Sequence, residues 1–162
     1  MASELRVDKI HNEGGDNDSG IDLSTNDQIV LKTANTTRLT MNATGQTTIV
    51  GEGGSTTTSV QQGLAKCWFQ ITQDSSHSID DSFNVGSISD DGAGETTVNF
   101  SNAMSNSDWS GVLTAQGSNN RRAVNNAPNT TRIKVETYQV DSNTSATDAT
   151  GGVSGAVHGD LA

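Results

Sequence analysis

Cysteine, proline and aromatic residues are scarce in this 162-residue sequence, and each scarcity argues against a class of structure. Cys67 is the only cysteine, so the chain can form neither an internal disulfide nor a cysteine-rich metal site. Pro128 is the only proline, which argues against a proline-rich disordered linker. Aromatic residues make up 4% of the chain and hydrophobic residues 31%, against about 45–50% apolar residues in globular proteins. One subunit therefore has little material for a large core of its own.

Positive charge is also scarce. The chain has 9 Lys and Arg residues against 19 Asp and Glu residues, which gives a formal net charge of -10 at pH 7. Such a surface repels phosphate backbones and anionic lipid headgroups, so we expect neither a nucleic acid nor a membrane as partner. The amino terminus has no apolar signal core, and no apolar run approaches the length of a membrane span. We therefore expect synthesis in a cytoplasm without export by the usual secretory route.

Serine, threonine, asparagine and glycine fill the places that apolar residues leave, and only 17% of the residues are charged. Disordered chains usually combine low hydrophobicity with dense charge, which this chain lacks. Threonine-rich, glycine-punctuated polarity instead favours thin β-layers that share a core between chains. We therefore predict an all-β protein that works as a homotrimer, since three subunits can pool apolar residues that one subunit lacks.

The first third of the chain consists of short alternating segments separated by turn residues. Residues 1–50 are therefore predicted to form a β-meander. Residues 51–63 are rich in Gly, Ser and Thr, and we assign them to a linker. The expected strands are Leu5–Ile10, Ile21–Leu23, Gln28–Lys32, Thr36–Met41 and Gln46–Val50.

Residues 64–162 hold every aromatic residue of the chain and are predicted to form a small β-sandwich-like domain or barrel. Trp68 and Phe83 lie on predicted strands and are expected to fill its core. Trp68, Trp109 and Tyr138 could instead stack on sugars, but in a chain so poor in aromatic residues core filling is favoured. The segment Ser118–Asn129 is polar and is assigned to a loop. The expected strands are Leu64–Ile71, Ser82–Ile88, Glu95–Phe100, Trp109–Ala115, Thr131–Tyr138 and Val153–Leu161.

The sequence offers little that would support catalysis. His11, His77 and His158 lie far apart, and no Gly-x-Ser-x-Gly motif accompanies the many serines. The glycine-rich segment Gly51–Thr56 lacks the third glycine of a dinucleotide-binding loop and the Gly-Lys-Ser/Thr ending of a P-loop. Cys67 lies beside Trp68 and Phe69 on a predicted core strand, where a buried thiol is inert. We predict a protein that is not an enzyme and binds no cofactor.

One loop is acidic enough to raise the question of a cation. Asp16 and Asp18, with Asp22 nearby, place several oxygen ligands on a tight turn, which a hard cation such as calcium prefers. The calcium-loop motif requires glycine at its sixth position and glutamate at its twelfth, where this sequence has Ile21 and Asp27. A solvated Asx-rich turn is therefore favoured over a metal site, and no metal ligand is assigned.

Two stretches of the sequence resemble virion proteins of bacteriophages. The run Ile29–Met41, followed by Gly45 and Ile49, is similar to a segment of phage tail fibres in which an L-x-T-x-N-T-x-R-L pattern leads through a glycine turn into another strand. Residues 65–104 resemble a domain at the carboxy end of fibre-like virion proteins of marine phages. Its recognisable parts are Trp68, Asp81–Val85, Ser87–Ile88, Asp91–Gly94 and Thr97–Phe100, and the chain ending Val157–Leu161 is similar as well.

The resemblance covers roughly half to two-thirds of the chain and implies a trimeric virion component with a slender stem and a carboxy-terminal knob. It gives residues 1–50 the role of an intertwined trimeric stem or a virion-anchoring region. The chain has no room for the tail-attachment domain and long shaft of a long tail fibre, so a short fibre, a head-attached fibre and a capsid decoration protein all stay open. We predict a non-enzymatic structural protein of the phage particle that serves attachment or decoration. Its expected partners are copies of itself, other tail or capsid proteins, and host surface polysaccharide. The alternative is a carbohydrate-binding adhesin module on a cell surface.

Contact with a receptor or partner is expected in the segment Gly117–Asn129, because loops on a rigid β-scaffold are free to present polar groups. Arginine and asparagine side chains can hydrogen-bond hydroxyl-rich or anionic glycans without an apolar pocket. The alternative is that the arginines bridge to acidic neighbours within the assembly. The predicted contact residues are Asn119, Asn120, Arg121 and Arg122.

Overall fold

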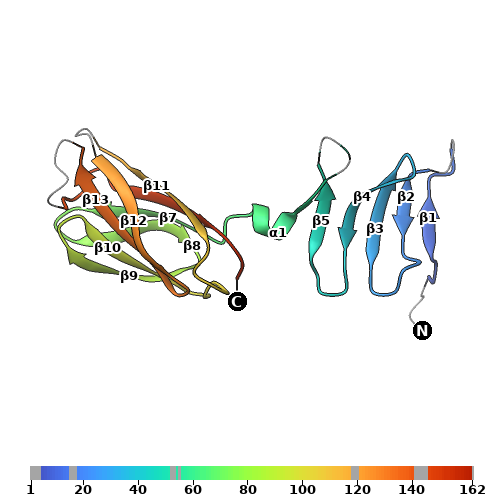
Figure 1. The fold of residues 1–162 in the computed structure, drawn as a ribbon, viewed down its shortest axis with the longest axis horizontal. Coiled ribbons are helices and arrows are strands. Elements are labelled where there is room, and N and C mark those ends of the chain that lie inside the picture. The colour runs from blue at the N-terminus through green and yellow to red at the C-terminus, as the bar shows by residue number, and fades with distance from the viewer. Residues whose placement is uncertain are drawn as a thin grey trace. The chain divides into compact units, whose positions relative to one another are not determined.

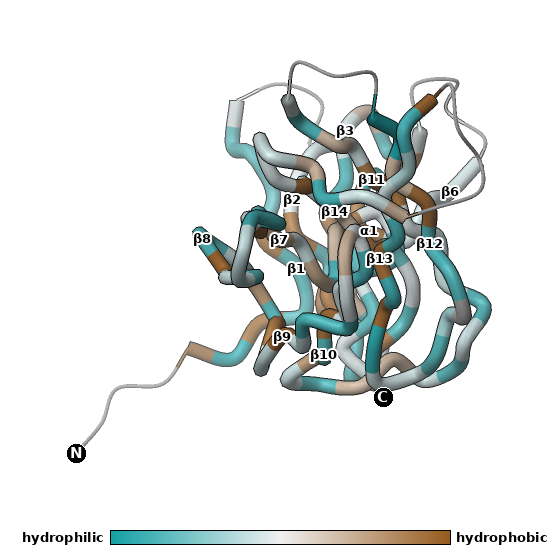
Figure 2. The backbone as a smooth tube through the Cα atoms, turned by 90° about the vertical axis from the view of Figure 1, so that its left-hand side faces the viewer, coloured by the Kyte–Doolittle hydropathy of each residue, from teal (hydrophilic) through white to brown (hydrophobic). Residues whose placement is uncertain are grey.

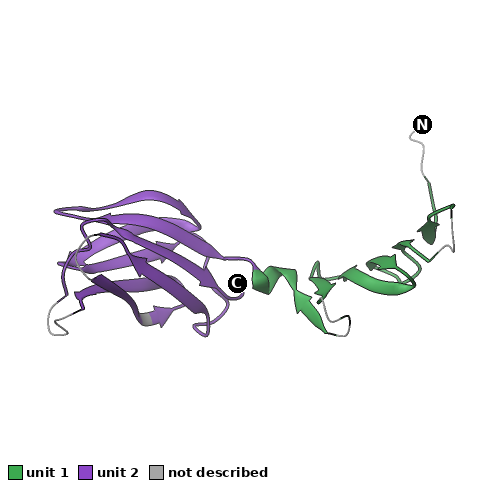
Figure 3. Cartoon of the chain, turned by 90° about the horizontal axis from the view of Figure 1, so that it is seen from above, with its two compact units in different colours: residues 1–63 green, residues 64–162 purple. Residues whose placement is uncertain are grey.

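The computed structural model describes residues 5–14, 18–51, 54, 56–117, 121–140 and 146–161. Its regular structure is almost entirely antiparallel β, which confirms the predicted all-β class. The chain divides into two compact units, residues 1–63 and residues 64–162, which Figure 3 shows in separate colours. Hydropathy mapped along the backbone shows apolar residues scattered in short pieces over the strands, with no long apolar segment (Figure 2).

Unit 1 is a six-stranded antiparallel meander in which every strand pairs with the next one in sequence (Figure 1). It forms a single layer of sheet, followed by one turn of helix, α1 (Val60–Gly63). The strands are β1 (Lys9–His11), β2 (Gly20–Asp22), β3 (Ile29–Thr33), β4 (Thr36–Met41), β5 (Thr47–Val50) and β6 (Thr57–Ser59).

The tightest connection in unit 1 is the two-residue turn between β3 and β4. Ala34 and Asn35 both have positive φ angles, 49° and 54°. This conformation matches the right-handed twist of the flanking strands in a hairpin, and Asn tolerates it better than most residues. The sequence predicted both this turn and the bounds of β4.

Two expectations for unit 1 require correction. The segment Leu5–Ile10 contributes only β1, which begins at Lys9 and ends at His11. Within the expected linker 51–63, Thr57–Ser59 forms β6 and pairs with β5, and the helical turn α1 follows it. Threonine has a high strand propensity, so a Thr-rich segment next to an open sheet edge extends the sheet instead of remaining a linker. The second unit begins at Leu64, where the carboxy-terminal domain was expected to begin.

Unit 2 is a sandwich of two four-stranded antiparallel sheets (Figure 1). One sheet has the order β12-β13-β10-β9 and the other β11-β14-β7-β8. The strands are β7 (Cys67–Gln73), β8 (His77–Phe83), β9 (Val85–Gly92), β10 (Glu95–Phe100), β11 (Ser110–Ala115), β12 (Arg121–Asn129), β13 (Arg132–Gln139) and β14 (Val153–His158).

The core of unit 2 lies between its two sheets and follows from strand alternation. Every second residue of β7, β10, β13 and β14 is buried, and Phe100 meets Trp109 edge-to-face at 6.0 Å between ring centroids. The buried core residues are Cys67, Phe69, Ile71, Val98, Phe100, Met104, Trp109, Ile133, Val135, Ala149, Val153 and Val157.

The prediction that Trp68 and Phe83 belong to this core is wrong. Trp68 is 40% exposed and Phe83 is 52% exposed. Cys67 and Phe69 turn inward on β7, so Trp68 between them must face outward. The expected strand Ser82–Ile88 is in fact broken at Asn84, whose φ is 60°, and its two halves belong to different sheets.

Candidate interaction surfaces

The most distinctive surface of unit 1 is a row of apolar side chains that crosses the sheet. Residues directly opposite one another on paired strands point to the same face of the sheet. Ile10 pairs with Ile21, Ile21 with Leu31, Leu31 with Leu39, and Leu39 with Ile49. The register therefore aligns one apolar residue from each of the first five strands.

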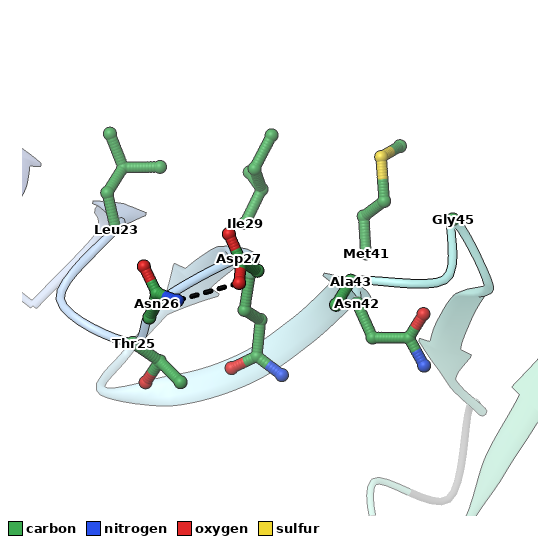
Figure 4. Close-up of a pocket in the computed structure, with 10 residues that line it drawn as sticks. Leu23, Thr25, Asn26, Asp27, Ile29, Met41, Asn42, Ala43 and Gly45 are labelled. Carbon is green, nitrogen blue, oxygen red and sulfur yellow. Dashed lines mark hydrogen bonds between the residues drawn. The ribbon is translucent and has the colours of Figure 1, made fainter.

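A second apolar row lies beside the first at one end of the strands. Ile29 pairs with Met41, and both lie two residues from members of the first row, which places them on the same face. Figure 4 shows Leu23, Ile29 and Met41 side by side and pointing the same way. We call the two rows together the apolar face. Its members are Ile10, Ile21, Leu23, Ile29, Leu31, Leu39, Met41 and Ile49.

The opposite face of the same sheet is mostly polar, with Val30 as a buried apolar residue on β3. Asp22 accepts a hydrogen bond from Lys32 Nζ at 2.7 Å, and Lys9 Nζ lies 3.9 Å from the same carboxylate oxygen. The bond from Lys32 and those from Ser24 hold the pKa of Asp22 well below its usual value. These charged side chains lie on that side of the layer, while Asp27 and Arg38 lie near the edges of the apolar face: Asp27 lines the hollow beside Ile29 and Met41, and Arg38 donates to Thr33.

The apolar face remains largely exposed in the isolated chain. Ile10, Ile29, Leu31, Met41 and Ile49 are each 39–47% exposed. The second row also borders an open hollow of about 610 Å³. The turn before β3 and the turn after β4 form the rest of its lining (Figure 4). No second layer among the described residues of unit 1 covers this face, because the whole unit is one sheet and one helical turn. A soluble sheet normally buries such a face against another element.

Two of the contact residues predicted from the sequence, Arg121 and Arg122, lie on a strand and not in a loop. Arg121 and Arg122 begin β12, and the expected loop Ser118–Asn129 is a strand from residue 121 onward. The loop assignment is therefore wrong for that part, because pairing with β13 supplies the order that the polar sequence does not signal. Asn119 and Asn120 lie outside the described residues.

Arg122 already has a partner within unit 2. Its guanidinium carbon lies 5.2 Å from the centre of the Tyr138 ring, in cation–π contact. Arg121, the preceding residue on β12, points to the other face, and its buried Nη1 has no hydrogen-bond partner among the described residues. The two arginines thus point to opposite faces of one strand and do not form a single binding site.

Tyr138 belongs to a polar cluster on the outer face of the β12-β13-β10-β9 sheet. Its hydroxyl donates to Glu136 Oε2 at 2.6 Å, and Asn126 donates to Glu136 Oε1 at 2.6 Å. The bond from Tyr138 is the main cause that lowers the pKa of Glu136, and the same bond raises the pKa of Tyr138. Lys134, whose Nζ donates to Glu95 at 2.8 Å, completes the cluster. These contacts stabilise the sheet.

His77 lies in a second polar cluster that the sequence did not reveal. Its side chain is 2% exposed, and its Nδ1 lies 2.9 Å from Thr96 Oγ1 while its Nε2 lies 3.4 Å from Asp148. A carboxylate, an imidazole and a hydroxyl are the groups of a nucleophilic triad. Thr96 is fully buried, however, so its hydroxyl is closed to any substrate. The arrangement joins β8, β10 and the segment before β14, and only the tertiary fold brings these residues together.

The remaining candidates for chemistry are equally enclosed or unsupported. Burial raises the pKa of the Cys67 thiol to about 12, which keeps it protonated and unreactive. Among the described residues, no group of three or more His, Cys, Asp or Glu side chains is placed to hold a metal ion. Asp16, from the acidic loop considered above, lies outside the described residues.

Comparison with known proteins adds no relative. No protein-family model, no curated protein sequence and no solved structure matches the chain. Among the described residues, no helix has the length and apolar character needed to cross a membrane.

Proposed function

We propose that the chain is a non-enzymatic structural component of a bacteriophage particle, a short fibre-type subunit that serves attachment or decoration and assembles as a homotrimer through the apolar face. The observation that carries the proposal is the uncovered apolar face on a one-layer sheet. The resemblance of Ile29–Met41 to tail-fibre segments supports the virion assignment, and this segment spans β3 and β4 in the middle of that sheet.

Copies of the chain are the partner that the apolar face fits best. The apolar face extends over five strands and has no charged member, and the Lys9, Asp22 and Lys32 side chains lie behind it. Three such sheets facing a common axis would bury all three apolar faces in one core, as a closed symmetric assembly requires. Burying the parts still exposed contributes roughly 0.5–1 kcal/mol for each large side chain, before the cost of association is subtracted.

The full-length chain provides a matched pair of variants for the test. Leu39 lies on the apolar face and Thr40, its neighbour on β4, lies on the opposite face. Light scattering after size-exclusion chromatography should give three times the 16.8 kDa chain mass for the wild type and for Thr40→Asp. Leu39→Asp should give the monomer, because it would place three carboxylates in the shared core. A monomeric wild type, or a Leu39→Asp variant that still trimerises, contradicts the proposal.

The virion assignment has a separate test. Mass spectrometry of purified particles from the source phage should detect peptides from both units. Particles that contain other structural proteins but not this chain would exclude a role in the mature particle.

A cell-surface carbohydrate-binding module is the second candidate, and the outward-facing Trp68 in unit 2 favours it. This alternative predicts a monomer that binds glycans, so the mass measurement distinguishes it from a trimeric fibre.

A further inference from the structure

We propose that the outer face of the β11-β14-β7-β8 sheet binds a neutral saccharide, with a sugar ring stacked on Trp68. This surface belongs to unit 2 alone, so the inference does not depend on the trimer or on the phage particle. It differs from the contact site expected in the segment Gly117–Asn129.

The register of the sheet lines up an exposed apolar row. Val112 pairs with Ala156, Ala156 with Trp68, and Trp68 with Phe83, one residue from each of the four strands. Val112 is 63% exposed, and both aromatic side chains are accessible on the outside of the sandwich. Since the core is formed by the other face of the same strands, packing within unit 2 does not explain why these residues are apolar.

The two tryptophans of the chain show what is unusual about this position. Trp109 is buried, and its indole N–H donates to the carbonyl oxygen of Asn129 at 3.1 Å. The indole N–H of Trp68 has no hydrogen-bond partner among the described residues, and its ring is open to solvent. An exposed indole presents a negative π face to the C–H groups of a pyranose ring and a free donor to a sugar hydroxyl.

A polar row lies two residues along the strands from the apolar row, about 6–7 Å away. In this row Thr114 pairs with Ser154, Ser154 with Gln70, and Gln70 with Asp81. Such a spacing lets one sugar ring lie over the apolar row while its hydroxyl groups reach the polar row.

Gln70 and Ser154 of the polar row are held in place by each other and by Gln116, which follows β11. Gln116 Nε2 donates to Ser154 Oγ at 2.7 Å and to Gln70 Oε1 at 3.2 Å, and Ser154 Oγ also donates to Gln70 Oε1. Groups that are already oriented lose less entropy when a ligand binds, so the arrangement favours recognition of hydroxyl groups.

The size of the surface favours a saccharide over a protein. Beside the apolar row, Val112 and Thr114 of β11 and the small residues Ser154, Gly155 and Ala156 of β14 line an open hollow of about 220 Å³. Pockets for drug-sized ligands measure about 300–1,000 Å³, so this hollow suits a smaller group such as one sugar ring. The apolar row is about 14 Å long and about 7 Å wide, so it covers roughly 100 Å², far less than the roughly 800 Å² per partner that a stable protein interface buries. Neither row contains Lys or Arg, which favours a neutral glycan over an anionic one.

The test uses the full-length chain on an array of immobilised neutral oligosaccharides in the gluco, manno and galacto configurations. We expect the wild type to bind at least one of these classes. Trp68→Ala should weaken that binding by about 10-fold or more through loss of the stacked ring. Gln70→Ala should also weaken binding, and Trp68→Phe should restore part of it. Leu64→Ala, which removes an exposed apolar side chain of unit 2 outside the two rows, should bind like the wild type.

Trp109 fluorescence during thermal unfolding shows whether each variant is folded, because this indole lies in the core of unit 2. If Trp68→Ala were unfolded, Gln70→Ala and Trp68→Phe would still decide the matter. The inference is overturned if the wild type binds no neutral glycan, or if folded Trp68→Ala binds like the wild type. If Trp68→Ala binds glycans like the wild type but forms a smaller assembly in solution, this face is a protein interface instead. The mass of the Leu39→Asp variant tests the proposed trimer separately.

Discussion

Replacing Gln73 by methionine should destabilise unit 2 by about 2–3 kcal/mol, because Gln73 hydrogen-bonds the two sheets to each other across the core. The Gln73 side chain is fully buried on β7. Its Nε2 donates to Thr96 Oγ1 at 2.8 Å, and its Oε1 accepts from Thr137 Oγ1 at 2.9 Å. The same oxygen accepts from the backbone N–H of Ala149 at 3.3 Å.

The magnitude follows from what each partner would retain. Thr96 keeps its contact with His77, and Thr137 keeps its bond to the carbonyl oxygen of Thr147 at 2.6 Å. The buried N–H of Ala149 would lose the bond that Gln73 accepts. An orphaned buried donor costs about 1–3 kcal/mol and each of the other two bonds contributes about 0.5–1.5 kcal/mol, while the apolar methionine offsets part of the loss. For a domain of this size, 2–3 kcal/mol lowers Tm by about 10–20 °C.

Tryptophan fluorescence during thermal unfolding measures this change directly, because both tryptophans lie in unit 2. Gln139→Met is the matched control, since Gln139 is exposed at the end of β13, and its Tm should stay within about 2 °C of the wild type. A Tm for Gln73→Met equal to that of the control would refute the argument that this amide joins the sheets.

Two further predictions concern titratable groups. The hydrogen bond from Tyr138 lowers the pKa of Glu136 in the folded state below its usual 4.5, so the folded state binds fewer protons there than the unfolded state. The stabilisation that Glu136 provides is therefore complete above about pH 4.5 and is lost as the pH falls through the folded-state value. Urea titrations should give Glu136→Gln a lower stability than the wild type at neutral pH and a smaller further loss in acid; a parallel pH dependence would contradict this. Burial raises the pKa of Cys67 to about 12, so iodoacetamide should label the urea-unfolded chain at pH ~8 but not the native chain, and rapid native labelling would show that the thiol is accessible.

Local patterns in the sequence predicted the strands of unit 1 well where alternation and turn chemistry agree. Thr36–Met41 alternates and follows Ala34-Asn35, whose two positive φ angles form the hairpin turn, and β4 has the expected bounds. Both signals act over a few residues, which is why the sequence alone could predict them. The all-β class and the meander order follow from repeating such local signals.

Tertiary structure decided which face of a strand lies in the core. The run Cys67-Trp68-Phe69 is apolar at every position, so its sequence is compatible with either face turning inward. Cys67 and Phe69 pack against the opposite sheet, and Trp68 is therefore placed outside beside Phe83. β12 was missed for a related reason, because a polar segment gains its order from pairing with β13 and has no pattern of its own.

The apolar face shows most clearly what the sequence predicts and what the tertiary structure adds. Alternation in the sequence shows that Leu31 and Ile29 share one face of β3, as Leu39 and Met41 do on β4. Only the register of the paired strands places Leu31 opposite Leu39, and Leu39 opposite Ile49, in one continuous row. A one-residue change of register would turn one set of these side chains to the other side of the sheet, because side chains alternate with a period of two. Composition and alternation therefore determined that the chain forms thin β-layers, while strand pairing decided which side chains share a surface.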